Sequence, residues 1–436
     1  MDGAKKPRLL PDIRQEFAHH LPGIARINNG SFGCCPESVL AVQRSWQLRF
    51  LRQPDHFYFN ALRPALLRSR ALIKDLVNAD HIDEISLLNN ATTAAAVVLH
   101  HIGRSFSRGL FPKDDTVLIF HCAFQAVKKS IQAYVSRAGG SVVEIHLPFP
   151  VHSPQQIVSE FRKGLERAKA NGSSRIRLAI IDHITSMPSV LMPVRELVRA
   201  CREEGVDQVF VDAAHALGTV PVDVKEIGAD FYVSNLHKWF FCPPSVAFFY
   251  CRKSALTSQI HHPVIIHEYG NGLPLESSWI GTRDYSSQLL VPSAVEFVNR
   301  FEGGIEGIMK RNHDGVVQMG KMLAESWGTI LGSPPNMCAS MIMVALPSKL
   351  GINSDNDASR LRSHLRTSYG VEVPIYYQAP RETDGAAGPR DKDGLITGYA
   401  RISHQVYNTE EDYHKFRDAI NQLVENGRVC RLLLTE

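Results

Sequence analysis

The sequence predicts an α/β protein in which a large domain with a mostly parallel sheet is followed by a smaller α+β domain at the C-terminus. Between residues 116 and 250, short runs of β-branched and aromatic residues alternate with helical stretches. This alternation is typical of a parallel sheet that is covered by helices on both faces. Past about residue 291, longer helical patterns replace it, which indicates a second domain.

The elements follow in order along the chain. Apolar residues spaced three or four apart predict helices over residues 35–59 and 61–77. Further helical stretches at about 123–137, 154–170 and 194–204 separate the first strands of the sheet. The predicted strands of the large domain are 116–120, 141–145, 176–181, 208–211, 231–234 and 246–250.

The C-terminal part mixes both kinds of element. Its predicted strands are 340–346, 371–376 and 399–403, and its predicted helices lie near 356–368 and 409–425. Residues 381–394 contain no large apolar side chain, so they are predicted to form a solvated, mobile loop, and a role as a lid stays open. The expected division of the chain is an N-terminal segment (1–60), a large domain (61–290) and a small domain (291–436).

Composition excludes several classes of protein. The 48 basic and 44 acidic residues leave a net charge of only +4, too small to indicate a nucleic acid or an anionic membrane as partner. No apolar run is long enough for a transmembrane helix, and the first residues lack the apolar region of a secretory signal. None of the eight cysteines forms a C-x-x-C pair or a zinc-finger spacing, which favours a reduced intracellular protein. We expect a cytoplasmic location, with an organelle as the alternative.

Two strand ends carry the residues that point to chemistry. One apolar strand ends in Asp212, and a later strand leads into His237 and Lys238. Because ligands bind at the carboxyl ends of strands in open α/β sheets, Asp212 and Lys238 should meet at one site. An aspartate and a lysine placed this way suit pyridoxal 5'-phosphate: the lysine forms the Schiff base, and the aspartate keeps the ring nitrogen protonated. His215 is expected to bond the ring hydroxyl or to orient Asp212.

The stretch from residue 209 to 250 resembles the cofactor-binding region of class V aminotransferase-fold enzymes, whose signature is a D-x-A-H-A run followed by an H-K pair. Other segments match in order, so the resemblance covers nearly the whole chain. The chain is most similar to the isopenicillin N epimerase-like branch, which includes plant L-cysteine desulfhydrases. The resemblance implies aminotransferase fold type I, with a sheet of the seven-stranded type, and a homodimer with shared active sites.

The resemblance also assigns residues to the cofactor phosphate. Thr92 and Thr93 follow an Asn-Asn-Ala turn that begins an apolar helix, and helix N-termini favour anions. Ser234 and His237 are expected to contact the same phosphate. Thr282, in the run WIGTRD, resembles the family's G-T motif, whose threonine reaches the phosphate of the partner subunit.

Other residues are expected around the cofactor ring. The family places an aromatic side chain on the ring, and either His121 or Phe124 of the run HCAF fits that place. The run DHITS resembles a motif of the epimerase-like branch, and it implies that Asp182, His183 and Ser186 lie near the ring or its substrate.

Two further segments are expected to face the substrate. Residues 28–33 (NNGSFG), which include Asn29, resemble the family's substrate-side loop. Residues 401–408 (RISHQVYN) resemble a C-terminal motif whose arginine binds the substrate carboxylate. Because guanidinium geometry suits a bidentate contact, Arg401 together with Lys238 implies an amino-acid substrate.

Several reactions branch from a bound amino acid: β-elimination, epimerisation and transamination. Cysteine desulfurases of the same class need a nucleophilic cysteine shortly before the carboxylate-binding arginine, but residues 371–401 contain none. The favoured hypothesis is therefore an L-cysteine desulfhydrase, in which Lys238 removes the α-proton and hydrogen sulfide, pyruvate and ammonia are released. A lyase acting on a cysteine S-conjugate or sulfoxide, an amino-acid epimerase and a non-catalytic scaffold stay as alternatives.

Overall fold

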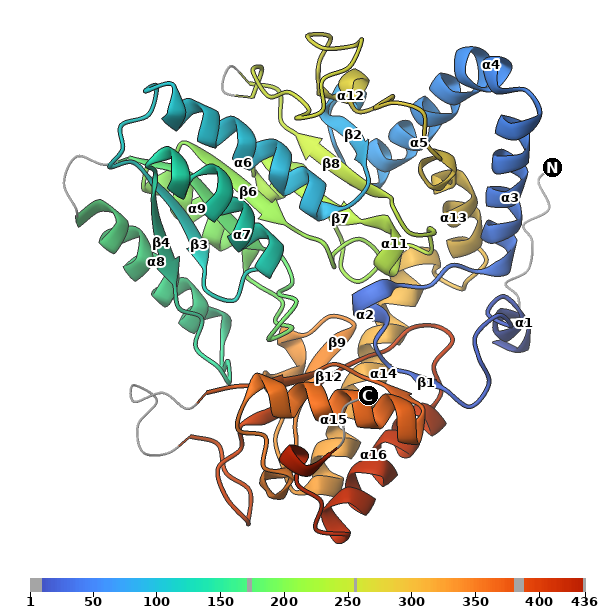
Figure 1. The fold of residues 1–436 in the computed structure, drawn as a ribbon, viewed down its shortest axis with the longest axis vertical. Helices are drawn as coiled ribbons and strands as arrows, with labels where there is room; N and C mark the ends of the chain where they lie inside the picture. Colours follow the sequence, from blue (N-terminus) through green and yellow to red (C-terminus); the bar gives the residue numbers. More distant parts are fainter. Residues whose placement is uncertain (1–9, 171–174, 255–256, 380–387, 434–436) are drawn as a thin grey trace.

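A computed structural model describes residues 10–170, 175–254, 257–379 and 388–433 of the protein. Its centre is a seven-stranded sheet in the upper half of Figure 1, with the strand order β2-β8-β7-β6-β5-β3-β4. Strands β4, β3, β5, β6 and β7 run parallel, whereas β8 is antiparallel to both β7 and β2, so the predicted mostly parallel sheet is confirmed. The strands are β2 (Ile85–Leu88), β3 (Thr116–Phe120), β4 (Ser141–Ile145), β5 (Ile176–Asp182), β6 (Gln208–Asp212), β7 (Phe231–Asn235) and β8 (Ala247–Cys251).

Both faces of this sheet are buried, which explains why its strands read as continuous apolar runs. Leu118 and Phe120 of β3 belong to one core cluster, and Val117 and Ile119 belong to the other. The helices that accompany the sheet are α5 (Arg63–Leu76), α6 (Ala91–Ser107), α7 (Gln125–Tyr134), α8 (Pro154–Ala170), α9 (Val194–Glu203), α10 (Val224–Ile227), α11 (Leu236–Trp239), α12 (Leu273–Glu276) and α13 (Val291–Val298). A helix thus follows each parallel strand along the chain.

Every predicted strand of the large domain is present, with ends that differ by at most one residue. Strands β5, β6 and β7 each run one residue further than predicted and therefore include Asp182, Asp212 and Asn235. Strand β2 was not predicted, because its four residues are too few to show a pattern and it pairs only with β8 at the sheet edge.

The C-terminal part holds a three-stranded antiparallel sheet in the order β11-β12-β9. The prediction of one strand over 371–376 is wrong, because Pro374 divides it into β10, which pairs with β1, and β11, which pairs with β12. Residues 381–387 of the predicted loop lie outside the described residues. The elements are α14 (Gly304–Trp327), β9 (Met341–Ala345), α15 (Asp355–Tyr369), β10 (Val371–Glu372), β11 (Ile375–Tyr377), β12 (Gly398–Ser403) and α16 (Glu410–Glu425).

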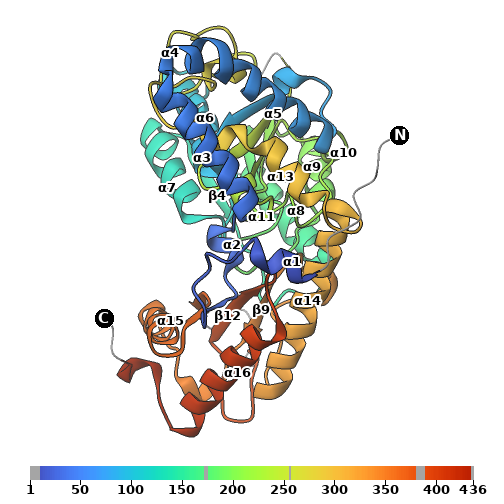
Figure 2. The ribbon, with the colours of Figure 1, turned by 90° about the vertical axis from the view of Figure 1, so that its right-hand side faces the viewer.

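The N-terminal segment touches both halves of the molecule. Figures 1 and 2 show α2 between the large sheet and the C-terminal part. Ala25 and Ile27 pack into the C-terminal core, whereas Val39 packs into the large one. The division at residues 60 and 290 stays a proposal. The elements are α1 (Leu10–Gln15), β1 (Ala25–Arg26), α2 (Asn29–Phe32), α3 (Glu37–Arg52), α4 (Pro54–His56) and a π-helix (Phe57–Leu62).

Within the described ranges, no helix is long and apolar enough to cross a membrane.

Candidate active site

A cavity lies at the carboxyl ends of β5, β6 and β7, where open α/β sheets bind their ligands. Strands β5 and β6 deliver the two aspartates, and α11, which begins directly after β7, delivers the lysine. The cavity is lined by Ala91, Thr92, Phe124, Asp182, Ile184, Ser186, Asp212, Ala214, His215, Asn235 and Lys238. The predicted meeting of Asp212 and Lys238 therefore takes place in the structure.

The two carboxyl groups of the cavity are neighbours on adjacent strands. Asp182 pairs in register with Asp212, and both side chains are buried. Asp212 Oδ1 accepts a hydrogen bond from the Ala214 backbone N–H at 3.1 Å, whereas Asp182 Oδ2 has no hydrogen-bond partner in the described structure. Burial raises the pKa of both groups, and the neighbouring Asp212 raises the pKa of Asp182 further. A cationic or N–H-bearing ring beside them would relieve this cost.

The Lys238 amine is half-buried in the cavity, and its Nζ lies 3.2 Å from Nε2 of His215. Burial and, to a smaller extent, the Arg401 cation lower the pKa of Lys238 to about 8, although the Asp212 carboxylate raises it. His215 is buried and does not bond Asp212 here; its second ring nitrogen, Nδ1, lies 3.3 Å from Nε1 of Trp239. The lysine is thus held close to the neutral form that an amine nucleophile or base requires.

The backbone on both sides of Lys238 is tightly enclosed. Gly33 has φ +73°, and a Cβ there would lie 1.7 Å from the carbonyl oxygen of His237. Gly218 has φ +94°, and a Cβ there would lie 2.4 Å from the carbonyl oxygen of Trp239. Asn29 Nδ2 donates to the carbonyl oxygen of Lys238 at 2.9 Å. The substrate contact expected for Asn29 stays a prediction, but its amide holds the lysine segment in this structure.

Helix α6 points its N-terminus at the cavity. Asn90 caps the helix, because its Oδ1 accepts from the backbone N–H of Thr93 at 2.9 Å. Asn235 Oδ1 accepts from the backbone N–H of Ala91 at 2.9 Å, which ties the end of β7 to this helix. Thr92 is exposed in the cavity wall, while the hydroxyl of Thr93 bonds the capping Asn90 at 3.1 Å. Thr92 and the helix end suit an anionic group.

The structure separates the two candidates for the stacking ring. Phe124 lines the cavity and is 49% exposed, which is unusual for a phenylalanine and leaves its face free for a ligand. The His121 ring does not line the cavity: its Nδ1 accepts a hydrogen bond from the backbone N–H of Leu147 at 3.1 Å. Of these two residues, Phe124 alone lines the cavity, and the stacking role stays a prediction.

Arg401 is a buried cation whose hydrogen-bond acceptors among the described residues are neutral oxygens. The Arg401 side chain belongs to β12 and is 2% exposed. Its Nη1 donates to the carbonyl oxygen of Ser186 at 2.7 Å and to the Ser186 hydroxyl at 2.9 Å. Its Nη2 donates to Ser31 Oγ at 2.7 Å and to Asn28 Oδ1 at 3.3 Å. No ion pair joins Arg401 to a carboxylate of the described residues. A buried charge is stabilised by an opposite charge close to it. This site therefore suits a ligand carboxylate near Ser186, and Ser186 also lines the cavity.

Besides Asn29, Thr93, His121 and Arg401, four more predicted residues lie outside the cavity wall. The Ser234 hydroxyl accepts from the backbone N–H of Leu217 at 3.0 Å, and His237 Nδ1 lies 2.9 Å from the carbonyl oxygen of Val246. His183 Nδ1 lies 2.8 Å from the hydroxyl of Tyr232. Thr282 is exposed, on the turn that also contains Arg283. The roles expected for Ser234, His183, His237 and Thr282 stay predictions.

Sequence reasoning missed the residues that hold the others in place. Asn235 and Trp239 flank the predicted His-Lys pair, and Ser31 lies inside the predicted Asn28–Gly33 loop, so each was close to a recognised motif. Their partners lie far away along the chain, which is why the motif alone did not assign them.

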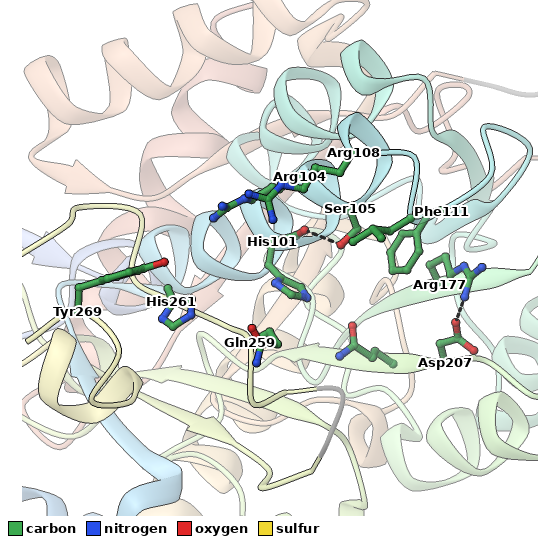
Figure 3. A pocket seen from close by; sticks show the side chains of 12 residues that line it. His101, Arg104, Ser105, Arg108, Phe111, Arg177, Asp207, Gln259, His261 and Tyr269 are labelled. Atoms are coloured by element: carbon green, nitrogen blue, oxygen red, sulfur yellow. Dashed lines mark hydrogen bonds and ion pairs between the residues drawn. The ribbon is translucent and has the colours of Figure 1, made fainter.

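A second hollow lies at the other end of the strands (Figure 3). His101, Arg104 and Arg108 of α6 face it from one side, and His261 and Tyr269 of a long loop face it from the other. Its remaining wall includes residues at the amino ends of β5 and β6. Because catalytic groups gather at the carboxyl ends in this kind of sheet, the smaller cavity at Lys238 is the candidate active site.

The residues of that cavity fit pyridoxal phosphate. Asp212 and Asp182 line the cavity, and Asp182 Oδ2 lacks a partner in the described structure. Phe124 exposes its ring, and Thr92 at a helix N-terminus lines the same cavity as the Lys238 amine. An acid for the ring nitrogen, an aromatic face, an anion site and an amine are the four features that this cofactor needs. None of the described residues forms a His, Cys, Asp or Glu group that could hold a metal ion.

Known proteins resemble this chain in sequence and in fold. A family model described as aminotransferase class-V matches residues 56–416. An L-cysteine desulfhydrase of Arabidopsis thaliana is 68% identical over 98% of this chain and 95% of the relative, and a probable L-cysteine desulfhydrase, chloroplastic, of the same plant is 62% identical over 99% and 91%. Among solved structures, a cysteine desulfurase from Thermococcus onnurineus superposes with a TM-score of 0.71 at 18% identity, covering 96% of this chain and 99% of that one.

Proposed function

This chain belongs to the class V aminotransferase family, and we propose that it is a pyridoxal phosphate-dependent L-cysteine desulfhydrase. The reaction takes L-cysteine and water to hydrogen sulfide, pyruvate and ammonia. The observation that carries the proposal is one cavity lined by Lys238, by the Asp182–Asp212 pair and by Ser186, which accepts a hydrogen bond from the buried Arg401. The 68% identity to an L-cysteine desulfhydrase supports the choice of substrate.

The residues of the chain divide the work among them. Lys238 is the attachment point of the cofactor, and its amine, with a pKa of about 8, can accept the proton from the substrate Cα. Asp212 provides the negative charge for the ring nitrogen, Phe124 the stacking face, and Thr92 with the start of α6 the phosphate site. When bound, pyridoxal phosphate supplies an electron sink for the charge left on Cα. Arg401 binds the substrate carboxylate.

The thiols of the chain favour release of sulfide over transfer to the protein. All eight cysteines lie in the described residues, six are buried, and only Cys122 and Cys251 are partly exposed. Burial raises the pKa of both partly exposed thiols, that of Cys251 to about 12, and Asp182 also raises that of Cys122. A persulfide acceptor has to be a reactive thiolate, and none of these thiols fits that role.

The proposal is tested with the purified chain, pyridoxal phosphate and L-cysteine. We expect an absorbance band of the bound cofactor and equal amounts of sulfide and pyruvate. Lys238→Ala should lose both the band and the products, while Lys225→Ala, a lysine on the surface that pairs with Asp80, should keep both.

Other outcomes of the same assay would overturn the proposal. Sulfide accompanied by alanine would mean desulfurase chemistry. Products only from S-substituted cysteines or cysteine sulfoxides would mean a different C–S lyase, and loss of chirality without sulfide would mean an epimerase. If the wild-type chain showed no cofactor band, a non-catalytic scaffold protein would be the alternative that remains.

We also propose that the chain acts as a homodimer. Large apolar side chains are exposed on the N-terminal helices, such as Leu51 (70%) and Phe59 (73%), and on the loop before Thr282, such as Ile265 (62%). The two segments adjoin, because Tyr58 stacks on Trp279 with ring centroids 5.5 Å apart. A surface of this kind is typical of an interface. Light scattering should give twice the 48.6 kDa of one chain, and a monomer would contradict the proposal.

The cytoplasm is the compartment that we propose, with an organelle as the alternative. Free thiols at all eight cysteines suit a reducing compartment. One relative is named chloroplastic, so imaging of a full-length chain fused at its C-terminus to a fluorescent protein should include plastids. Fluorescence confined to an organelle would contradict the cytoplasmic proposal.

A further inference from the structure

Three side chains next to the cavity form a chain of polar contacts. Nε1 of Trp239 lies 3.3 Å from Nδ1 of His215, and Nε2 of His215 lies 3.2 Å from Nζ of Lys238. His215 and Trp239 are buried, with 2% and 1% exposure, so water does not compete for the contact between these two side chains. The order of donors and acceptors in this chain follows from chemistry alone.

An indole nitrogen can only donate a hydrogen bond. Nδ1 of His215 must therefore accept, which makes it the nitrogen without a proton. In a neutral imidazole the proton then resides on Nε2, and Nε2–H faces Lys238. The lysine can complete the chain only as an acceptor, that is, as a neutral amine with a free electron pair.

We propose that Trp239 is a positioning residue, which fixes His215 in the tautomer protonated on Nε2 and thereby favours the neutral form of the Lys238 amine. The inference rests on the proposed attachment of the cofactor at Lys238 and goes beyond it, because it assigns a role to an indole that faces no ligand. A protonated Lys238 would place an N–H group opposite the Nε2–H of His215. A protonated His215 would place its Nδ1–H opposite the indole N–H of Trp239.

Trp239 is well placed for this role because its indole is packed on all sides. It belongs to a small apolar cluster with Ile184, Ala339 and Met341. Its backbone is enclosed by Gly218, where a Cβ would lie 2.4 Å from the Trp239 carbonyl oxygen. The direction of the indole N–H is therefore set by packing and does not adapt to His215.

Other charges act on the same two groups. Arg401, from β12, disfavours protonation of both Lys238 and His215, and His237 disfavours protonation of His215. Asp212, from β6, favours protonation of Lys238. The contribution of Trp239 differs from these charges because it acts through the tautomer of His215, and it disappears when His215 is replaced.

The first test measures the tautomer directly in the cofactor-free, full-length chain labelled with ¹⁵N-histidine. His215→Gln identifies the signals by their loss. We expect Nδ1 of His215 with the chemical shift of an unprotonated ring nitrogen and Nε2 with that of a protonated one. The opposite tautomer, a mixture of both, or a protonated ring at pH 7 overturns the proposal. This readout needs neither cofactor nor activity, so it stands even if the proposed reaction is wrong.

The second test uses Trp239→Phe, which removes the N–H and keeps an aromatic ring. His215 can then present an unprotonated Nε2 to Lys238, which favours the ammonium form. We expect the midpoint of the pH dependence of pyridoxal phosphate attachment to rise by about one pH unit. A shift of this size is expected when Lys238 donates the hydrogen bond to His215 where it had accepted it. An unchanged midpoint overturns the proposal.

Two controls separate this effect from lost packing. Trp327→Phe removes another buried indole, whose Nε1 has no partner in the described structure, and should leave the midpoint unchanged. In a His215→Gln background, Trp239→Phe should no longer shift the midpoint, and a shift that persists there overturns the proposal. If Trp239→Phe does not fold, the tautomer measurement on the wild-type chain decides alone.

Discussion

Asp182 and Asp212 are register partners on the neighbouring parallel strands β5 and β6, and both carboxyl groups are buried at the same cavity. Two buried acids side by side are costly without a cation or a donor between them. Their placement therefore indicates that the cavity binds a cation or a hydrogen-bond donor.

The pair makes the cofactor-free chain sensitive to pH. Burial raises the pKa of both acids in the folded state, so the folded chain binds more protons than the unfolded one above pH 4. By linkage, the free energy of unfolding must fall as the pH rises. We expect Asp182→Asn to remove part of this fall, so that it is about 1–2 kcal/mol more stable than the wild type at pH 8 but not at pH 5. Urea unfolding at both pH values checks this, and equal differences at the two would contradict it.

Attachment of the cofactor should follow the protonation of Lys238. Burial lowers the pKa of this amine to about 8, and only the neutral amine attacks an aldehyde. The rate of pyridoxal phosphate attachment should rise about tenfold per pH unit below pH 8 and level off above it. Stopped-flow absorbance measures the rate, and a free lysine derivative, with an ordinary pKa near 10, serves as the control. A rate that keeps rising to pH 10 would show that the amine is not perturbed.

Arg401 should discriminate substrates by their carboxylate. Its guanidinium is held by Ser31 and Ser186 and by no carboxylate of the residues that the structure describes, so a bound amino acid would supply the missing charge. Arg401→Lys loses the two-pronged contact, and kcat/KM for L-cysteine should fall about 10–100-fold, as for a lost hydrogen bond to a charged group. The methyl ester of L-cysteine, which lacks the charge, should be affected much less. An equal loss for acid and ester would mean that Arg401 only supports the fold.

Gly33 should be needed for the placement of Lys238. A Cβ at this position would lie 1.7 Å from the His237 carbonyl oxygen and 2.8 Å from Cα of Lys238, so the lysine segment would have to move. We expect Gly33→Ala to lose cofactor binding. Gly23→Ala is the matched control, because Gly23 has φ +75° and no atom within 4 Å of the added Cβ. It should cost only the strain of the left-handed backbone, about 1–2 kcal/mol by urea unfolding, and keep the cofactor.

Local sequence patterns were sufficient to predict most of the strands of the large sheet. The run that became β3 was predicted to the residue, because a strand buried on both faces is apolar along its length and therefore stands out from its flanks. The strand-end rule brought Asp212 and Lys238 together without any knowledge of the helices between them. Where a proline broke a short strand, or where an edge strand had four residues, the pattern was too weak.

The sequence by itself determined the parallel sheet, the chemistry at its carboxyl edge and the family, because these depend on residue types at strand ends and on motifs in a set order. Only the tertiary structure showed that Phe124 lines the cavity, and only it joined Arg401 to Ser31, 370 residues apart along the chain. The physical reason is that a side chain's role is set by its partners. Hydrogen bonds between distant segments are fixed by packing and leave no periodic trace in the sequence.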